Sequence, residues 1–478
     1  MLSFYHTFAK ISTKIVKFSY FITREQLNNA KRCVILSLNR YAIRHTTKEL
    51  TMKITDKKTK RPVKIIQFGA GVFLRGFFDW MLQGVNDAGI YNGNAVVVRS
   101  RTSGADPLEA QGFNYTHLSR DASHNEVTLI DSISGSLNAC EDYAGFLALA
   151  ENPDTDVVVS NTTEAGIVYQ ECERPDNSCP ESFPAKLCAL LYHRYKKGLS
   201  PMLVVPCELI ENNADILKDA VVRHANDWAL EKGFFDYIER CSFRNTLVDR
   251  IVSGKPSEKI DLGYEDELIN TSEYFYLFVI EGERDERLPF DKLYDGVKFV
   301  PSVKPYRTIK VRILNGAHTS MIPFALNRGV PSVGECLKNE VVSAHLSECL
   351  GEIVDSLDID RSETESYAKS VLERFANPYI YHKCAAISLN SVSKFKVRVL
   401  PSILDYERKF GKAPKALVRA FAELIKFYKE GTPSDSPDAM EKLKNGTVEQ
   451  ILSDKELWGE DLSRLAKEVN AYANSSKR

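Results

Sequence analysis

The sequence lacks a strong charge of either sign and lacks any long apolar run. Its 478 residues carry 63 Lys and Arg against 64 Asp and Glu, a formal net charge of −1. No overall field therefore attracts nucleic acid or an anionic membrane. The longest apolar runs, such as residues 33–38, fall far short of the roughly 20 residues that a membrane-spanning helix needs. We expect neither a nucleic-acid partner nor a membrane partner.

The ten cysteines do not fall into the short, regular spacings of a metal-binding framework. Cys172 and Cys179 are the closest pair in the central region, and no second pair of that kind accompanies them. Reduced thiols are then the default interpretation, as in a cytoplasmic protein. The sequence predicts no metal site.

The first fifty residues differ from the rest of the chain in composition. They contain nine Lys and Arg but only two acidic residues, Glu25 and Glu49. Such an acid-poor segment is typical of an organellar transit peptide. An over-long gene start, with the true beginning at Met52, is the alternative that we favour. Under either interpretation, residues 1–51 are an N-terminal extension outside the fold.

A strand, a glycine-rich turn, a helix and a second strand follow one another after this extension. Val63–Phe68 is a short apolar run typical of a buried strand, and residues 95–98 form another. The helix between them is expected to end at Gly89. This order predicts a βαβ unit and hence a parallel sheet. Residues 156–160 and 202–206 are predicted to add two more strands, each with polar residues at its end.

The glycine-rich turn has the pattern of a dinucleotide-binding loop. Gly69 would allow a tight turn, and Gly71 would let the backbone approach a pyrophosphate at the helix N-terminus. The third glycine of the pattern is displaced, because Leu74 occupies its usual place and Gly76 follows two residues later. A plain strand-to-helix turn is the alternative.

The residues after the second and third strands bear on the choice of cofactor. An acidic residue usually ends the second strand of an NAD-binding domain, whereas this chain has Arg99 and Arg101. Two arginines could accept the 2′-phosphate of NADP or could be solvated. After the third strand, Asn161, Thr163 and Glu164 suit the nicotinamide half of a cofactor, and an ordinary turn is the alternative.

Beyond about Pro301 the apolar pattern is predominantly helical. Residues 414–430, for example, place their apolar side chains on one stripe. We therefore predict an α/β fold in two parts: a Rossmann-like parallel-sheet domain over residues 52–300, and a mostly α-helical domain over residues 301–478.

A short cassette at the start of the helical part combines a lysine, an amide and an imidazole. If the segment is an α-helix with about 100° per residue, Lys310, Asn315 and His318 fall within an arc of about 140°. These groups could supply a proton, stabilise an oxygen and hold a hydroxyl. A helix start with an incidental lysine and a packed histidine is the alternative.

Other charged residues stand next to apolar runs or turns. Asp249 and Arg250 lie side by side among apolar residues, which is typical of a structural ion pair. Arg374 precedes a turn. Lys394 and Arg398 belong to a Lys-x-Lys-x-Arg run, which more often forms a solvated strand edge than a site. Arginine nevertheless provides a bidentate fork for a carboxylate.

Three motifs together resemble the long-chain polyol dehydrogenases. They are the Gly-x-Gly-x-Phe-x-Arg turn, the Val-Asp-Arg-Ile block and the Lys-(x)4-Asn-(x)2-His cassette. Members of this family, which includes mannitol dehydrogenase and the hexuronate reductases, are metal-independent and use a nicotinamide cofactor. The resemblance runs from about Lys64 to beyond Pro401 and is closest to the hexuronate reductases at residues 66–75, 160–167, 206–210 and 313–319.

The resemblance implies a reversible reduction of D-tagaturonate to D-altronate by NADH. Lys310 would be the general acid/base, Asn315 would hydrogen-bond the developing oxyanion and His318 would hold sugar hydroxyls. Lys394 and Arg398 are our candidates for binding the uronate carboxylate. The remaining candidates are Asp249 for the substrate and Gly69, Gly71, Val72, Phe73, Arg75, Asn161, Thr163 and Glu164 for NAD.

One departure from the family leaves alternatives open. Mannitol-type members carry Asp-Asn where this chain has Glu208 and Leu209, so a second oxyanion amide is missing there. Asn213, Asn161 or water could replace it. Reduction of fructuronate instead of tagaturonate, NADP instead of NAD, and a non-catalytic NAD-binding sensor are alternatives. The sequence does not indicate the oligomeric state.

Overall fold

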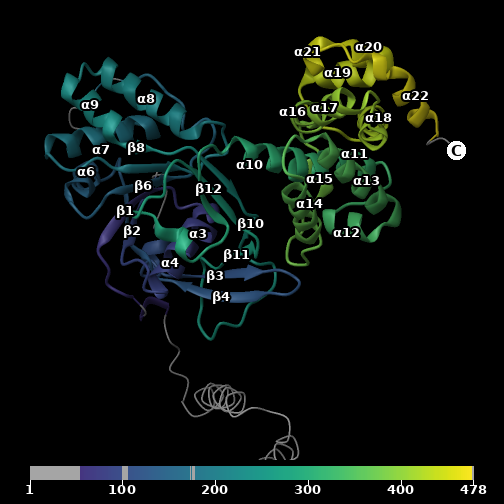
Figure 1. The fold of residues 1–478 in the computed structure, drawn as a ribbon. Helices are drawn as coiled ribbons and strands as arrows, with labels where there is room; N and C mark the ends of the chain where they lie inside the picture. The colour runs from purple at the N-terminus through teal and green to yellow at the C-terminus, as the bar shows by residue number, and fades with distance from the viewer. Residues whose placement is uncertain (1–53, 57, 100–105, 173, 175–177, 476–478) are drawn as a thin grey trace, which may run out of the picture. The chain divides into compact units, whose positions relative to one another are not determined.

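The computed structural model describes residues 54–475, except 57, 100–105, 173 and 175–177 (Figure 1). The predicted extension 1–51 and Arg101 therefore lie outside the described residues. Ile54–Ile260 and Asp266–Arg478 belong to one compact unit. Every element discussed below lies in that unit.

A six-stranded parallel sheet forms the centre of the N-terminal half. Its strand order, β5-β2-β1-β6-β7-β8, is that of a dinucleotide-binding fold with the order reversing between β1 and β6. The predicted strands are confirmed as β1, β2, β6 and β7, whereas β5 and β8 escaped prediction because they are short or rich in small polar residues. The strands are β1 (Val63–Phe68), β2 (Asn94–Arg99), β5 (Ile133–Asn138), β6 (Val157–Ser160), β7 (Leu203–Pro206) and β8 (Ser242–Phe243).

Helices cover both faces of this sheet (Figure 1). Ile65 packs on one face with residues of α4, and its neighbour Ile66 packs on the other with residues of α7 and α8, as the alternation of side chains along a strand requires. The Rossmann-like prediction is confirmed. The helices are α3 (Val72–Gly76), α4 (Phe78–Asp87), α5 (Pro107–Ala110), α6 (Tyr143–Ala148), α7 (Phe183–Lys196), α8 (Asn213–Asp227) and α9 (Lys232–Arg240), with the 3₁₀ turns η1 (Ile54–Asp56) and η2 (Leu149–Glu151).

The first predicted helix is divided in two. The backbone at Phe77 leaves the helical region, with φ −129° and ψ −77°, and separates α3 from α4. The predicted end is confirmed, because Gly89 has φ +69° immediately after the last turn. The chain changes direction at this break, and α3 lies beside strands outside the central sheet.

Two smaller sheets complete the N-terminal half within the described residues, and the sequence analysis did not foresee them. One has the order β10-β11-β3-β4 and the other β13-β12-β9. Gly76 packs against the first: a Cβ atom there would lie 2.7 Å from Val252 and 2.9 Å from Asn270 and His117. The displaced third glycine thus permits close packing of α3 on this sheet. The strands are β3 (Tyr115–Arg120), β4 (Asn125–Ile130), β9 (Thr246–Asp249), β10 (Val252–Gly254), β11 (Asn270–Glu273), β12 (Leu277–Glu281) and β13 (Val297–Val300), with the turn η3 (Pro289–Lys292).

The C-terminal half is helical, as predicted, and has its own core around α11, α13 and α18. The run containing Lys394 and Arg398 lies on helix α16, so the expectation of a strand edge is wrong. The helices are α10 (Lys304–Ile309), η4 (Lys310–Asn315), α11 (Gly316–Leu326), α12 (Val333–Lys338), α13 (Glu340–Ser356), α14 (Arg361–Phe375), α15 (Cys384–Ile387), α16 (Ser391–Arg398), α17 (Leu400–Phe410), α18 (Lys415–Glu430), α19 (Pro437–Asn445), α20 (Val448–Ser453), α21 (Lys455–Trp458), η5 (Ser463–Leu465) and α22 (Ala466–Ser475).

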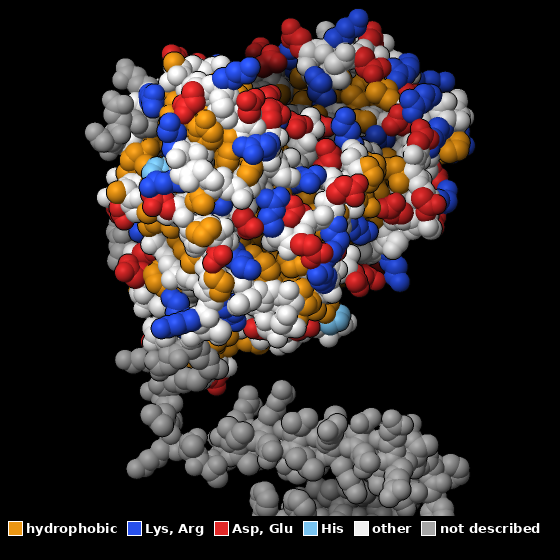
Figure 2. All heavy atoms as spheres, turned by 60° about the vertical axis from the view of Figure 1, so that its left-hand side comes forward, with side chains coloured by type: hydrophobic (Ala, Val, Ile, Leu, Met, Phe, Trp, Pro, Cys, Tyr) orange, Lys and Arg blue, Asp and Glu red, His pale blue; other side chains and the backbone are white. Residues whose placement is uncertain are grey.

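Charges of both signs are mixed on the surface. Figure 2 shows Lys and Arg side chains interspersed with Asp and Glu over the face that it presents. No helix among the described residues is both long enough and apolar enough to cross a membrane. The same part of the chain holds no cluster of three or more His, Cys, Asp or Glu side chains suited to a metal ion.

Candidate active site

A cavity of about 720 Å³ lies at the carboxyl ends of β1, β2 and β6. This is where the strand order reverses, and where open α/β sheets bind their ligands. Four of the predicted cofactor residues line it: Gly69, Gly71, Asn161 and Thr163.

The glycine turn leaves room for a ligand beside the backbone. Gly69 has φ +115°, which side-chain-bearing residues rarely adopt, and a Cβ atom there would lie 3.2 Å from the carbonyl oxygen of Asn161. Gly71 has open space where a Cβ would project, with no atom within 4 Å. Backbone N–H groups at such a turn can meet a pyrophosphate. The turn therefore fits a dinucleotide.

The other predicted cofactor residues do not line the cavity. Phe73 stacks on Phe77 with ring centroids 4.9 Å apart. Arg75 donates to the carbonyl oxygen of Leu268 at 2.7 Å. Val72 and Glu164 have exposed side chains outside the lining.

Arg99 is the one arginine of the second-strand pair that the structure describes, and it borders the cavity. Its Nε lies 3.4 Å from the Asp106 carboxylate. An acidic partner reduces the attraction of this arginine for a 2′-phosphate.

Glu208 supports the loop that lines the cavity, a role that the sequence analysis did not predict. It lies two residues beyond the end of β7, is buried, and accepts hydrogen bonds from the Thr162 backbone N–H at 2.8 Å and from the hydroxyls of Thr162 and Ser160 at 3.1 Å. Burial raises the pKa of Glu208 against the effect of these hydrogen bonds. The carboxyl group therefore ties β7 to the loop that lines the cavity.

Neither asparagine considered as a second oxyanion amide is without a hydrogen-bond partner. Asn213 donates to the carbonyl oxygens of Pro206 and Glu208 and accepts from the Thr246 backbone N–H. Asn161 donates to the carbonyl oxygen of Cys207 at 2.7 Å. Asn213 thus connects the end of β7 with the start of β9.

The Lys310 cassette is helical, but its first part is a π-helix. Residues Lys310–Asn315 form the wider π turn η4 between α10 and α11. The angular separation expected from 100° per residue is therefore wrong over this stretch, because a π turn contains an extra residue. Such turns are frequent at functional sites.

Lys310 points toward the end of strand β9. Its Nζ donates to the carbonyl oxygen of Val248 at 2.7 Å and lies 3.7 Å from the Asp249 carboxylate. Burial lowers the pKa of Lys310, while the negative charge of Asp249 opposes that shift. The result is a shielded ammonium whose proton is easier to remove than that of an exposed lysine.

His318 and Asn315 have polar atoms available for a ligand. The His318 ring stacks on Phe375 with centroids 4.2 Å apart, and its buried Nε2 has no hydrogen-bond partner among the described residues. Burial, helped by the charges of His382 and Arg374, lowers the pKa of His318 to about 3, so the ring is neutral near pH 7. In the same part of the chain, the Asn315 side chain has no hydrogen-bond partner either.

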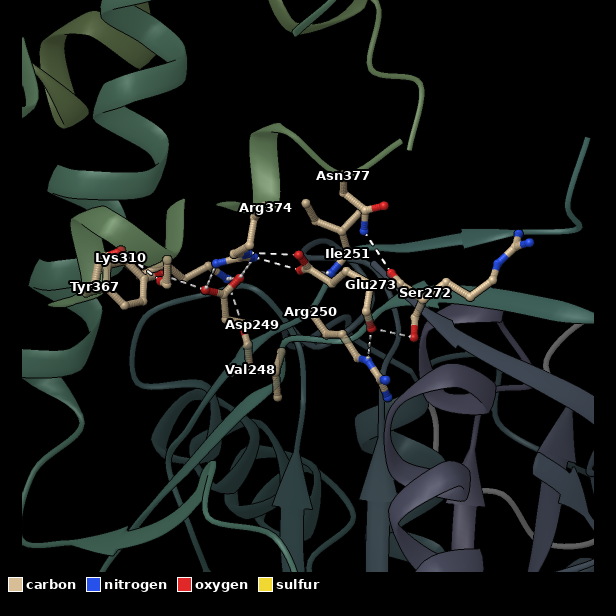
Figure 3. Close-up of polar contacts among 12 residues, drawn as sticks. Val248, Asp249, Arg250, Ile251, Ser272, Glu273, Lys310, Tyr367, Arg374 and Asn377 are labelled. Atoms are coloured by element: carbon tan, nitrogen blue, oxygen red, sulfur yellow. Dashed lines mark hydrogen bonds and ion pairs between the residues drawn. The ribbon is translucent and has the colours of Figure 1, made fainter. Parts of the chain in front are cut away.

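Asp249 does not pair with its neighbour Arg250, contrary to expectation. The Asp249 carboxylate contacts Arg374 from helix α14 (Figure 3). Arg250 instead donates to the carbonyl oxygen of Gly76 at 2.7 Å, and its guanidinium lies 4.0 Å from the centroid of the Trp80 ring. Adjacent residues of an extended segment point to opposite sides, which separates the two charges.

Comparisons with known proteins agree with this architecture. Residues 63–292 match the mannitol dehydrogenase Rossmann domain, and residues 302–478 match the mannitol dehydrogenase C-terminal domain. A protein of Escherichia coli named altronate oxidoreductase is 38% identical over 451 residues, which cover 86% of this chain and 93% of that protein. The chain belongs to the mannitol dehydrogenase family.

Other members extend the comparison. The altronate oxidoreductase of Bacillus subtilis is 39% identical, with 89% of this chain and 94% of that protein covered. Two solved structures, each 20% identical, share the fold. D-sorbitol dehydrogenase has a TM-score of 0.75 over 87% of this chain and 94% of its own. Pseudomonas fluorescens mannitol 2-dehydrogenase, in a ternary complex with NAD and D-mannitol, has a TM-score of 0.66 over 89% and 92%.

As a member of the mannitol dehydrogenase family, the chain is an oxidoreductase for a small polyol or sugar acid and uses a nicotinamide cofactor. The cavity at the carboxyl ends of β1, β2 and β6 fits that cofactor. The Lys310 cassette lies next to the end of β9 through contacts with Val248 and Asp249.

Lys394 and Arg398, the predicted carboxylate ligands, lie one turn apart on α16. The charge of Arg398 contributes to the lowered pKa of His318, after burial and the charges of His382 and Arg374. The carbonyl oxygen of Arg398 is 3.1 Å from where a Cβ on Gly316 would stand, so the end of α16 packs closely on the start of α11. Within the described chain, neither basic side chain has a carboxylate partner.

Three further members of the site were missed as functional residues: Glu273, Tyr367 and Arg374. The sequence showed Arg374 only as a basic residue before a turn. No local pattern indicates that it meets Asp249 and Glu273, because these contacts span 125 and 101 residues. The only available signal was the presence of acidic residues in apolar surroundings, which require buried partners.

Proposed function

We propose that this protein catalyses the reversible reduction of D-tagaturonate to D-altronate with NADH as the hydride donor. Relatives named altronate oxidoreductase, at 38% and 39% identity over most of the chain, support this choice. The structural observation that carries it is the shielded Lys310 ammonium beside Asp249, on the same cassette as the Asn315 amide and His318 Nε2, which have no hydrogen-bond partner among the described residues.

The proposed chemistry assigns one role to each cassette residue. During reduction, the Lys310 ammonium gives a proton to the oxygen of the forming alcohol, and in the reverse direction the neutral amine takes that proton away. Asn315 donates a hydrogen bond to the same oxygen as negative charge develops on it. Neutral His318 binds a substrate hydroxyl through Nε2. The role of Asp249 is electrostatic: its negative charge stabilises the ammonium form of Lys310. The oxygens of Asp249 already accept hydrogen bonds from Arg374 and Tyr367.

Residues at the carboxyl ends of the parallel strands would hold the cofactor. Gly69 and Gly71 would admit the pyrophosphate, and Asn161 and Thr163 would face the nicotinamide half. When bound, the cofactor supplies the hydride or accepts it. NAD is preferred over NADP in this proposal because Asp106 partly neutralises Arg99.

The unpaired cations of α16 favour a sugar acid over a neutral polyol. Burial lowers the pKa of Arg398, and no acidic residue in the described chain compensates its charge. Lys394 donates to the carbonyl oxygen of Ile387 at 2.9 Å and retains further N–H groups. A substrate carboxylate would supply the missing negative charge.

A substrate panel tests this proposal. Initial rates of NADH and NADPH oxidation are measured with tagaturonate, fructuronate and fructose. We expect the highest kcat/KM with tagaturonate and NADH. Faster turnover of fructuronate would refute the substrate assignment, and equal turnover of fructose would refute the role of Lys394 and Arg398.

A further inference from the structure

A cluster of buried charges links the lysine of the candidate site to helix α14. Asp249 and Glu273 end strands β9 and β11 and are only 4% and 1% exposed. Two ionised carboxylates in such a place are unstable unless cations neutralise them. Lys310 and Arg374 are the cations that reach them (Figure 3).

Arg374 makes close contacts to both carboxylates. Its Nη1 and Nη2 donate to the two oxygens of Asp249, each at 3.0 Å, in a bidentate arrangement. Its Nε and Nη2 donate to the two oxygens of Glu273 at 2.9 and 2.8 Å. In Figure 3 the guanidinium lies between the two acidic side chains. A planar fork can do this, whereas a point charge cannot.

Lys310 interacts with Asp249 more weakly than Arg374 does. Its nearest partner is the neutral carbonyl oxygen of Val248 at 2.7 Å, and the carboxylate is 1 Å farther away, at 3.7 Å. The Tyr367 hydroxyl, also from α14, donates to Asp249 at 2.6 Å. The donors from α14 therefore hold the Asp249 carboxylate at 2.6 to 3.0 Å, closer than the 3.7 Å that separates it from Lys310.

We propose that Arg374 is a positioning residue for the reaction: it restrains Asp249 from pairing closely with Lys310, and Glu273 is the counter-charge that keeps Arg374 in this role. The inference rests on the proposed function, because it matters only if Lys310 exchanges a proton with the substrate. A lysine locked in a close buried ion pair would hold its proton too firmly to act as a base.

The charges around Lys310 determine the sign of each expected effect. Asp249 from β9 raises the pKa of Lys310, while burial, Arg374 from α14 and Arg307 from α10 lower it. His318, on α11, is neutral. Removing Arg374 takes away a like charge and releases Asp249, so both changes raise the pKa of Lys310. Removing the negative charge of Glu273 leaves the positive charge of Arg374 less neutralised, which lowers the pKa of Lys310.

The test measures the pH dependence of kcat/KM for altronate oxidation by NAD, in which neutral Lys310 accepts the proton. We expect Arg374→Gln to move the acidic limb to higher pH by about one unit, the low end of the shift that a nearby charge causes. Arg374→Lys, which keeps the charge but not the fork, should move it less. Glu273→Gln should move it in the opposite direction, to lower pH.

Glu373→Gln is the matched control for Glu273→Gln, because it removes the same negative charge beside Arg374 but at a position of α14 where the side chain is 69% exposed. It should leave the profile unchanged. If Arg374→Gln does not fold, Glu273→Gln decides alone, since glutamine can still accept from Arg374. Lowered rates with an unmoved limb in the folded variants would show that Arg374 is only structural. A wild-type protein inactive on every sugar acid would instead contradict the proposed function itself.

Discussion

At the scale of single residues, the site depends on what burial does to each ionisable group. Burial lowers the pKa of Lys310 and of His318, but the outcomes differ. The charge of Asp249 opposes the effect of burial on Lys310, whereas at His318 that charge has a smaller effect than burial does, and the ring stays neutral near pH 7. Lys310 is therefore suited to the proton transfer proposed for it, whereas the neutral ring of His318 is suited to hydrogen bonding.

Replacing Lys310 therefore tests the chemistry directly. We expect Lys310→Met to lower kcat/KM about 10²- to 10⁴-fold, the usual contribution of a general acid or base. NADH binding, measured by fluorescence titration, should be nearly unchanged because Lys310 does not line the cavity at the strand ends. Lys304→Met, on an exposed position of α10, is the control and should keep full activity. Retained reductase activity in Lys310→Met would contradict the proton-transfer role, and an intact NAD-dependent response of another kind would favour a sensor.

At the scale of elements, the turn after β1 serves two purposes through two glycines. Gly71 faces open space and leaves room for a ligand, whereas Gly76 faces side chains of β3, β10 and β11. The break at Phe77 separates the two functions by ending α3 after Gly76. Gly71 thus leaves space beside the turn, whereas Gly76 allows close packing.

This division predicts opposite results for two equivalent substitutions. Gly76→Ala should lower the free energy of unfolding by roughly 1–3 kcal/mol, because its Cβ would overlap Val252, Asn270 and His117. Gly71→Ala should keep wild-type stability, since its φ of −66° suits alanine, but should weaken NADH binding several-fold. Urea unfolding and NADH titration of both variants check this. A destabilised Gly71→Ala with normal NADH affinity would show that the turn is only structural.

At the scale of the whole molecule, a buried acid makes stability depend on pH. Asp79 lies on α4 behind the glycine turn, where it accepts from Tyr115 at 2.8 Å and from Gln67 at 3.4 Å. Burial raises the pKa of Asp79 to about 7 from an ordinary value of 3.8, despite these hydrogen bonds. The folded state therefore keeps a proton that the unfolded chain releases above pH 4.

The sign of the effect follows from this linkage. As pH rises from about 4 to 7, the unfolded state loses its proton first, so Asp79 reduces the stability of the wild type, and above pH 7 its effect levels off. The stability of Asp79→Asn relative to wild type should therefore increase as pH rises from about 4 to 8, by up to about 4 kcal/mol. Urea unfolding at pH 5, 6, 7 and 8 measures the difference. Asp87→Asn, with a 58% exposed side chain on the same helix, should show none. A constant difference between Asp79→Asn and wild type would contradict the assigned proton.

The parts that local rules determine were predictable. Val63–Phe68 is a strand because its apolar run is bounded by a glycine turn, and Gly89 ends a helix because it tolerates positive φ. The helical character of residues 310–318 was equally local. The π turn within that segment was not, since its apolar pattern does not distinguish a wide turn from a normal one.

Local sequence patterns were sufficient to predict the alternation of strands and helices, the dinucleotide turn, the helical C-terminal half and the chemical groups of the Lys310 cassette. The pairing of the buried charges, in contrast, could be seen only in the folded chain. Asp249 pairs with Arg374 instead of its neighbour Arg250, across 125 residues of chain. An apolar sequence context indicates that a charged side chain will be buried and will need a partner of opposite charge. The topology of the chain determines which partner that is, because a buried ion pair forms only where packing brings the two elements together.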